Sequence, residues 1–137
     1  MAPVAHARHG DLDDQVAAVL RPLARAAGLW PSSPVNLGRA DDYRVPDRVY
    51  LRERGDSLYV PTAAIVVEIV SPGDESFAQL GFYAARGVAE VLIVDPSTER
   101  CRWYANRSVE MVPVDGSRLL GLSAADLEAR IDWPPAD

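Results

Sequence analysis

The most hydrophobic stretch of the chain is residues 63–70, AAIVVEIV, which lies between Pro61 and Pro72. A short run rich in β-branched residues and bounded by prolines is typical of a strand that is buried on both faces. Glu68 is the charged residue in this run. An ionised carboxylate in such a place costs free energy unless it is paired, protonated or bound to a metal. The pattern therefore makes Glu68 the first candidate for a functional residue.

Helical spacing of apolar residues marks three other segments. It predicts a first helix over residues 11–27, ended by Gly28, where a left-handed C-terminal cap favours glycine. A second helix is expected from residue 74 or 75 to residue 86. A short last helix is expected over residues 124–130, capped by Ser123.

Apolar and alternating patterns predict the remaining elements as strands. Helices alternating with strands indicate an α/β or α+β fold with a central mixed sheet flanked by helices, in which a right-handed crossover joins the strands on either side of the second helix. We expect a flexible leader over residues 1–10 and one domain over residues 11–137. The other expected strands are residues 35–37, 45–51, 88–94, 102–105 and 109–114, with a turn at 30–34 and a polar connection at 38–43.

The strand over residues 45–51 carries a second carboxylate. If a turn at residues 55–58 joins it to residues 63–70 as a hairpin, Asp47 falls opposite Glu68. Two like charges opposed across strands repel each other, and a divalent cation would turn the repulsion into a pair of ligands. Carboxylate oxygens suit Mg²⁺ or Mn²⁺.

A different interpretation of the two carboxylates stays open at this point. Asp47 follows Pro46 and fits a turn at the edge of a strand. Glu68 could instead pair with an arginine such as Arg48 or Arg86. The residues alone favour neither the metal-binding hypothesis nor this alternative.

Composition limits the classes of function. The chain has 137 residues and a formal net charge of −6, which argues against a protein that coats nucleic acid or a membrane surface but leaves room for a local basic groove. All 14 basic residues are arginine, so no chemistry that needs a lysine is available within the chain. The single cysteine, Cys101, excludes an intrachain disulfide and a cysteine zinc site, and its alternating context predicts a strand residue. Without a visible signal peptide or membrane span, we expect a cytoplasmic protein.

Three strings carry a resemblance when taken together: VPDRV at residues 45–49, VVEIVSP at 66–72 and FYAARGVAEVLIVDP at 82–96. They resemble the bacterial Uma-type restriction endonuclease family, which belongs to the PD-(D/E)XK nuclease superfamily. The similarity extends over roughly residues 9–133. It implies a restriction-endonuclease-like fold and cleavage of DNA phosphodiester bonds with Mg²⁺ or Mn²⁺.

The resemblance also implies roles for particular residues. Asp47 and Glu68 match the acids that bind the metal, and the backbone carbonyl of Ile69 would be a further ligand. The superfamily's lysine would fall at Val70, and in this family it typically moves to the following helix, where Gln79 stands here. Glutamine can orient a water molecule through hydrogen bonds but supplies no positive charge.

The sequence offers weaker candidates around this site. Five arginines between residues 39 and 54 could form a phosphate-binding edge, with Arg44 and Arg48 as the expected nucleic-acid contacts, although scattered surface arginines are equally expected. His9 is expected to be a bystander. A two-fold homodimer is plausible because cutting both strands of a duplex needs two sites.

Two functions follow from these observations. The first is a metal-dependent endodeoxyribonuclease in which Gln79 orients the attacking water. The second is a catalytically degenerate nuclease-fold protein that binds nucleic acid or a protein partner. The lack of lysine and the acidic charge favour the second, whereas a carboxylate kept in the most hydrophobic strand favours the first.

Overall fold

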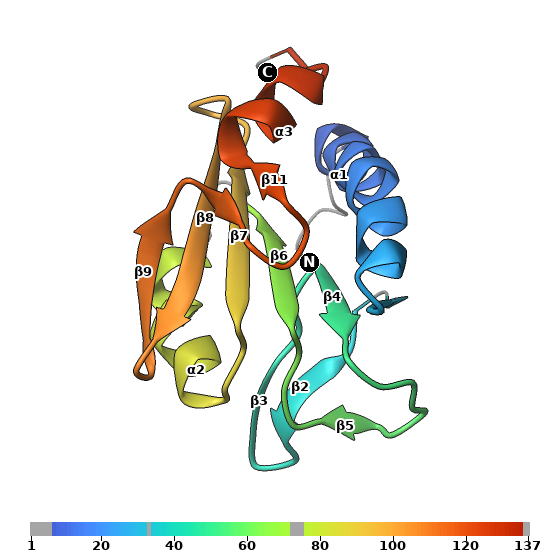
Figure 1. Ribbon diagram of the computed structural model, residues 1–137, viewed down its shortest axis with the longest axis vertical. Helices are drawn as coiled ribbons and strands as arrows, with labels where there is room; N and C mark the ends of the chain where they lie inside the picture. Colours follow the sequence, from blue (N-terminus) through green and yellow to red (C-terminus); the bar gives the residue numbers. More distant parts are fainter. Residues whose placement is uncertain (1–6, 33, 72–75, 136–137) are drawn as a thin grey trace, which may run out of the picture.

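A six-stranded mixed sheet forms the centre of the computed structural model, which describes residues 7–32, 34–71 and 76–135. The strand order is β1-β4-β6-β7-β8-β9, with β6 and β7 parallel and the other neighbours antiparallel (Figure 1). A smaller sheet, β3-β2-β5, extends from it, and β10 pairs with β11. The predicted fold class, a mixed sheet flanked by helices, is confirmed.

The main elements occur along the chain in the predicted order. The helices are α1 (Ala7–Ala26), the 3₁₀ turn η1 (Ser76–Gln79), α2 (Leu80–Ala85) and α3 (Ala124–Arg130). The strands are β1 (Trp30–Ser32), β2 (Asn36–Arg39), β3 (Asp42–Arg44), β4 (Arg48–Leu51), β5 (Tyr59–Val60), β6 (Ile65–Ile69), β7 (Glu90–Asp95), β8 (Arg100–Arg107), β9 (Glu110–Val114), β10 (Gly116–Ser117) and β11 (Leu122–Ser123).

Helix α1 begins earlier than predicted. It starts at Ala7 rather than at Asp11, so His9 is part of the helix and not of a leader. The predicted end is confirmed, because Gly28 has a φ of +79° and follows the last turn. The early start was missed because residues 7–10 lack the apolar spacing on which the prediction rested. Residues 1–6 of the predicted leader lie outside the described residues.

The sheet separates two hydrophobic layers. The side chains of Ile65, Val67 and Ile69 pack with α1 and α3 on one face. Val66, on the other face, packs with Tyr83 of α2, which lies behind β8 and β9 in Figure 1. Because side chains alternate along a strand, Glu68 shares the α2 face with Val66.

The predicted register between residues 45–51 and 63–70 is confirmed. Arg48 lies opposite Val67 and Val49 opposite Val66, so one further step places Asp47 opposite Glu68. The connection is longer than a simple hairpin, because β5 leaves the main sheet to pair in parallel with β2.

Two predictions of irregular structure were wrong. The expected turn at residues 30–34 contains β1, which pairs with the outer side of β4. The expected polar connection at residues 38–43 belongs to the β2–β3 ribbon. Both strands are too short to show a hydrophobic period, so pairing with neighbours decides them. The expected start of the second helix, at residue 74 or 75, lies outside the described residues.

A buried carboxylate on β7 holds the chain that leads to α3. Glu90 is 4% exposed, and one of its oxygens accepts hydrogen bonds from Trp103 Nε1 at 3.1 Å and Ser117 Oγ at 2.6 Å. The other oxygen accepts from the backbone N–H groups of Arg118 and Leu119, both at 3.1 Å. Four donors therefore converge on one side chain and fix the segment after β10 to the sheet.

We expect Glu90→Gln to lower the free energy of unfolding by about 2–3 kcal/mol, because the amide group places a donor against donors that then lose their acceptor. Urea denaturation measures the change. Glu110→Gln, at an exposed position of β9, is the matched control and should change stability by less than about 0.5 kcal/mol. Equal stability of the two variants would contradict the structural role of Glu90.

Candidate functional site

Asp47 joins the start of β4 to the end of β6. Its Oδ2 accepts a hydrogen bond from the backbone N–H of Ile69 at 2.7 Å. The preceding residue, Pro46, has no N–H to donate, so the regular ladder begins only at Arg48. The carboxylate of Asp47 thus takes the place of a backbone acceptor where the ladder ends.

The pKa of Asp47 is raised above its ordinary value, chiefly because burial removes water from the carboxylate. The Ile69 N–H and His9 oppose this rise, whereas the negative charge of Asp13 adds to it. The side chain keeps 28% of its surface exposed, so a solvent-borne ligand can reach it.

Tyr83 connects α2 to the second carboxylate. Its hydroxyl donates to Glu68 Oε1 at 3.1 Å, although the rest of the side chain is buried in the α2 layer. Burial first, and then the charge of Glu68, raises the pKa of Tyr83, so the hydroxyl stays protonated and remains a donor. The spacing of residues in the sequence gives no sign of this contact.

His9 reaches the site from α1. Its Nε2 lies 3.3 Å from Asp47 Oδ1, and its Nδ1 lies 3.1 Å from Ser71 Oγ. The sequence underrated this residue because the helix was expected to start after it. The signal that could have found it is the position of a histidine one turn before the apolar face of α1.

Gln79 and Arg44 meet beside α2. The Nε of Arg44 donates to Gln79 Oε1 at 2.6 Å, and the guanidinium lies 4.3 Å from the centre of the Phe82 ring. Any role of Gln79 therefore also involves Arg44, which is hydrogen-bonded to it. No spacing in the sequence predicts this contact, because Arg44 and Gln79 are 35 residues apart along the chain and belong to different elements.

The arginines proposed as partners of Glu68 bind other carboxylates. Arg48 Nε donates to Asp13 Oδ1 at 2.6 Å, which ties β4 to α1. Arg86 Nη2 donates to Asp42 Oδ2 at 3.1 Å. Asp42 also binds Arg44 Nη1 at 3.0 Å, so it bridges two arginines.

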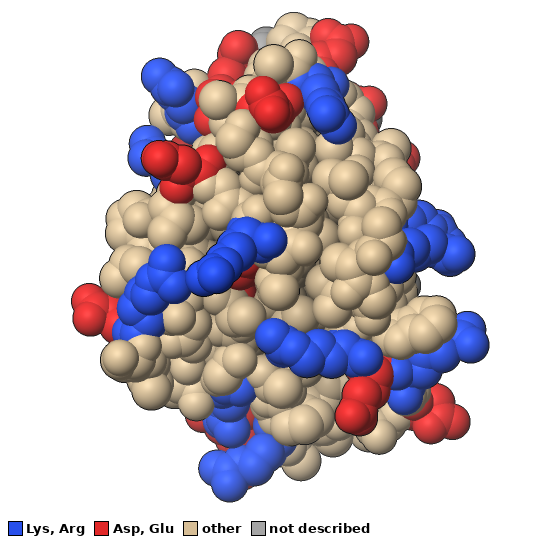
Figure 2. Space-filling model, in the orientation of Figure 1, with Lys and Arg blue, Asp and Glu red and all other residues tan. Residues whose placement is uncertain are grey.

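Charge on the rest of the surface is mixed. Figure 2 shows arginines and acidic residues interspersed over one face of the molecule, without one continuous basic area on that face. The mixed charge of this face is consistent with the net charge of −6.

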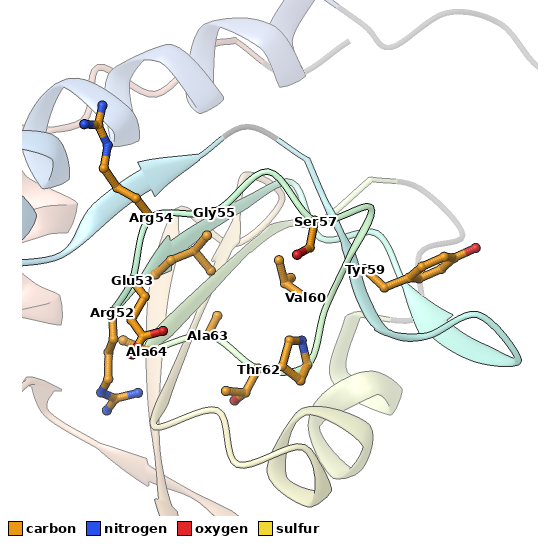
Figure 3. Close-up of a pocket in the computed structure, with 12 residues that line it drawn as sticks. Arg52, Glu53, Arg54, Gly55, Ser57, Tyr59, Val60, Thr62, Ala63 and Ala64 are labelled. Carbon is orange, nitrogen blue, oxygen red and sulfur yellow. The ribbon is translucent and has the colours of Figure 1, made fainter.

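One cavity of the molecule lies away from the carboxylates. It measures about 380 Å³ and is formed by residues 51–64, with Val60, Thr62 and Ala63 lining it below the loop that carries Gly55 and Ser57 (Figure 3). These residues follow β4 and precede β6, so the cavity is at the opposite end of both strands from Asp47 and Glu68. The candidate functional site is therefore the pair of carboxylates, whose chemistry suits a cation, and not this cavity.

The donors at the site fit an oxygen-preferring divalent cation. Two carboxylates share one face at opposed positions of adjacent strands. Within the described residues, no group of three or more histidine, cysteine, aspartate or glutamate side chains is arranged to hold a metal. A pair of carboxylates suits Mg²⁺, which keeps several waters, better than Zn²⁺, which prefers a full set of nitrogen or sulfur ligands.

Cys101 has no place in this chemistry. It is buried in β8, as its alternating context predicted, and burial raises the pKa of its thiol to about 12. Such a thiol is not a nucleophile near neutral pH.

None of the helices in the described part of the chain is long and apolar enough to cross a membrane.

Comparison with known proteins identifies the family of this chain. A family model described as "Uma2: Putative restriction endonuclease" matches residues 1–131, so the chain belongs to this family. The structure is similar to the crystal structure of a putative nuclease of the DUF820 family from Anabaena variabilis, with a TM-score of 0.72 and 15% identity. That likeness covers 93% of this chain and 84% of the other, and at this identity it shows the fold alone. No curated protein matches the chain.

We expect Asp47→Asn to make the metal-free protein at least as stable as the wild type at neutral pH. The folded-state pKa of Asp47 lies above its unfolded value, so ionisation costs stability as the pH rises from about 3.8 through the folded-state pKa. Asparagine keeps an oxygen for the Ile69 N–H without this cost. The difference should therefore vanish at acid pH and be fully present at neutral pH.

Thermal melts in a chelator, repeated from acid to neutral pH, measure this effect. Asp14→Asn, at an exposed position of α1, is the control and should follow the wild type. A loss of stability in Asp47→Asn that grows with pH would contradict the prediction, since it would mean that the partners of Asp47 outweigh its burial.

Proposed function

We propose that the protein is a divalent-metal-dependent endodeoxyribonuclease. The observation that carries the proposal is the pairing of Asp47 and Glu68 on one face of adjacent strands, in a chain of a restriction endonuclease family. Two carboxylates placed face to face at the end of a buried ladder raise the free energy of the metal-free fold. A bound cation would remove that repulsion.

Mg²⁺ or Mn²⁺ would be held by Asp47, Glu68 and the backbone carbonyl of Ile69. When bound, such a cation lowers the pKa of a coordinated water and stabilises negative charge on the reacting phosphate. The residues of the chain position these ligands: the Ile69 N–H fixes Asp47, and the Tyr83 hydroxyl fixes Glu68.

The remaining roles concern water and DNA. Gln79 lies one helical turn before Tyr83 and would orient the attacking water through its amide. Arg44 and Arg48 would contact phosphates of the backbone, but Arg48 would have to share its guanidinium with Asp13. A two-fold homodimer would supply the second site needed to cut a duplex, and we place the activity in the cytoplasm.

A second candidate is a degenerate nuclease that binds nucleic acid or a protein without cutting. The observation in its favour is that Gln79 occupies the lysine position and already accepts a hydrogen bond from Arg44. The two candidates make different demands on Glu68, because only the enzyme needs its charge on a metal.

We expect Mn²⁺ to raise the melting temperature of the wild type and to support cleavage of plasmid DNA. Glu68→Gln should abolish both effects, because the amide keeps the size of the side chain but removes the charge that binds the cation. At a Mn²⁺ concentration of about 100 times the dissociation constant, the stabilisation should be about 2.7 kcal/mol. Glu110→Gln is the control and should behave as the wild type.

Absence of both the thermal shift and cleavage in the wild type would overturn the metal site. A shift without cleavage would favour the degenerate candidate.

Gln79→Lys separates the two candidates further. If the wild type is an enzyme, we expect the variant to cleave within about tenfold of the wild-type rate, a change in barrier of about 1.4 kcal/mol, because the guanidinium of Arg44 already lies beside Gln79. Single-turnover cleavage of a labelled duplex with Mg²⁺ measures the rate. Cleavage by Gln79→Lys alone, with an inactive wild type, would show that the native site is degenerate.

A further inference from the structure

We propose that Arg44 and Arg86, bridged by Asp42 across the Phe82 ring, form a phosphate-binding subsite that supplies the positive charge missing from position 79. The inference rests on the proposed function, because it assigns the group that neutralises charge on the DNA backbone at that site. The occupant is a phosphodiester group of DNA.

The geometry of Arg44 is the first argument. Three contacts fix its guanidinium: Nε to Gln79 Oε1 at 2.6 Å, Nη1 to Asp42 Oδ1 at 3.0 Å and Nη1 to the carbonyl of Tyr43 at 2.9 Å. The side chain is nevertheless 40% exposed. An arginine that is held in place and still open to solvent has already lost much of the conformational entropy that binding a ligand would cost.

Arg86 is the second arginine of the subsite. Its guanidinium lies 4.9 Å from the centre of the Phe82 ring, and that of Arg44 lies 4.3 Å from the same centre. Its Nη2 binds both Oδ2 and the backbone carbonyl of Asp42, at 3.1 and 3.3 Å. Two guanidinium groups share one carboxylate, so the cluster keeps a net positive charge.

Donors remain for a ligand in this arrangement. In their hydrogen bonds with other described residues, Arg44 uses Nε and Nη1, and Arg86 uses Nη2. Each guanidinium carries five N–H donors in a planar fork that matches a phosphate better than an ammonium group does. The subsite can therefore bind a phosphate without first giving up the contacts that build it.

The β2–β3 ribbon is built to bring Arg44 to this place. Gly38 has a φ of +128°, and a Cβ at this position would clash with the carbonyl oxygen of Asp42. The same Cβ would lie 3.2 Å from Cζ of Phe82. The ribbon therefore folds tightly on itself and packs against α2 only because residue 38 is glycine.

The subsite adjoins the two carboxylates through α2. Gln79 and Tyr83 are four residues apart, so they lie on the same side of consecutive turns, and Tyr83 donates to Glu68. Gln79, which accepts the hydrogen bond from Arg44, is thus one turn away from the tyrosine that holds Glu68.

Binding in the absence of cleavage tests the subsite directly. The probe is a short fluorescein-labelled DNA duplex, and fluorescence anisotropy is measured over a range of salt concentrations in the Glu68→Gln background. We expect Arg44→Met to lower affinity and to reduce the slope of log K against log salt by about 1, because one phosphate contact is lost. Arg44→Lys keeps the charge but not the Nε contact, so it should retain most of the slope.

Arg107→Met is the matched control. Arg107 is exposed at the end of β8. This end of β8 pairs with the start of β7, whereas the two carboxylates lie at the end of β6. It should leave the slope unchanged. Equal slopes for Arg44→Met and Arg107→Met, or no salt-dependent binding by the parent protein, would overturn the inference.

Cleavage provides the second test, in the otherwise wild-type protein. Arg44→Met should lower kcat on the order of a hundredfold, as the loss of one transition-state donor does in other enzymes. Gln79→Lys added to Arg44→Met should restore at least about a tenth of the wild-type kcat, because it returns a cation to the same place. A merely structural role of Arg44 would give no such rescue, and its absence would overturn the claim that Arg44 replaces the lysine.

The outcomes also separate this inference from the proposed function. If the wild type does not cut DNA but shows the predicted salt slopes, the proposed nuclease activity is disproved and the phosphate-binding subsite is supported. A wild type that cuts DNA while Arg44→Met cuts equally well would keep the activity and remove the subsite.

Discussion

The antiparallel register of β4 on β6 is the constraint on which the site depends. It places Asp47 opposite Glu68, and the hydrogen bond from the Ile69 N–H to Asp47 closes the ladder at that point. A slip of one residue would turn Asp47 toward α1 and leave Glu68 without its partner. The slip is prevented by the two hydrophobic layers, because every apolar side chain of β4 and β6 would change face with it.

The same layers explain why two carboxylates can exist in the hydrophobic centre of the sheet. Both stand where the ladder ends, half-buried rather than enclosed, and each is held by a donor: a backbone N–H for Asp47 and a tyrosine hydroxyl for Glu68. The raised pKa of Asp47 shows that these donors do not fully offset its burial. Such residual cost is typical of a position kept for binding rather than for stability.

The positive side of the site is assembled differently from the negative side. The carboxylates come from neighbouring strands, whereas Arg44 is brought by a two-stranded ribbon and Arg86 by the end of α2, and the side chains of Asp42 and Phe82 hold them together. An acidic protein without lysine can in this way concentrate positive charge at one place. The fold similarity at 15% identity does not bear on this arrangement, which rests on the contacts of this chain.

The sequence by itself determined the order of the main elements, the buried strand, and the pairing of Asp47 with Glu68, because hydrophobic periodicity and hairpin symmetry are local properties of the chain. It did not determine β1, the β2–β3 ribbon or the start of α1, which are too short or too polar to show a period. Only the tertiary structure decided the contacts of His9, Tyr83 and Arg44, because each joins residues from separate elements whose distance in space no spacing along the chain encodes.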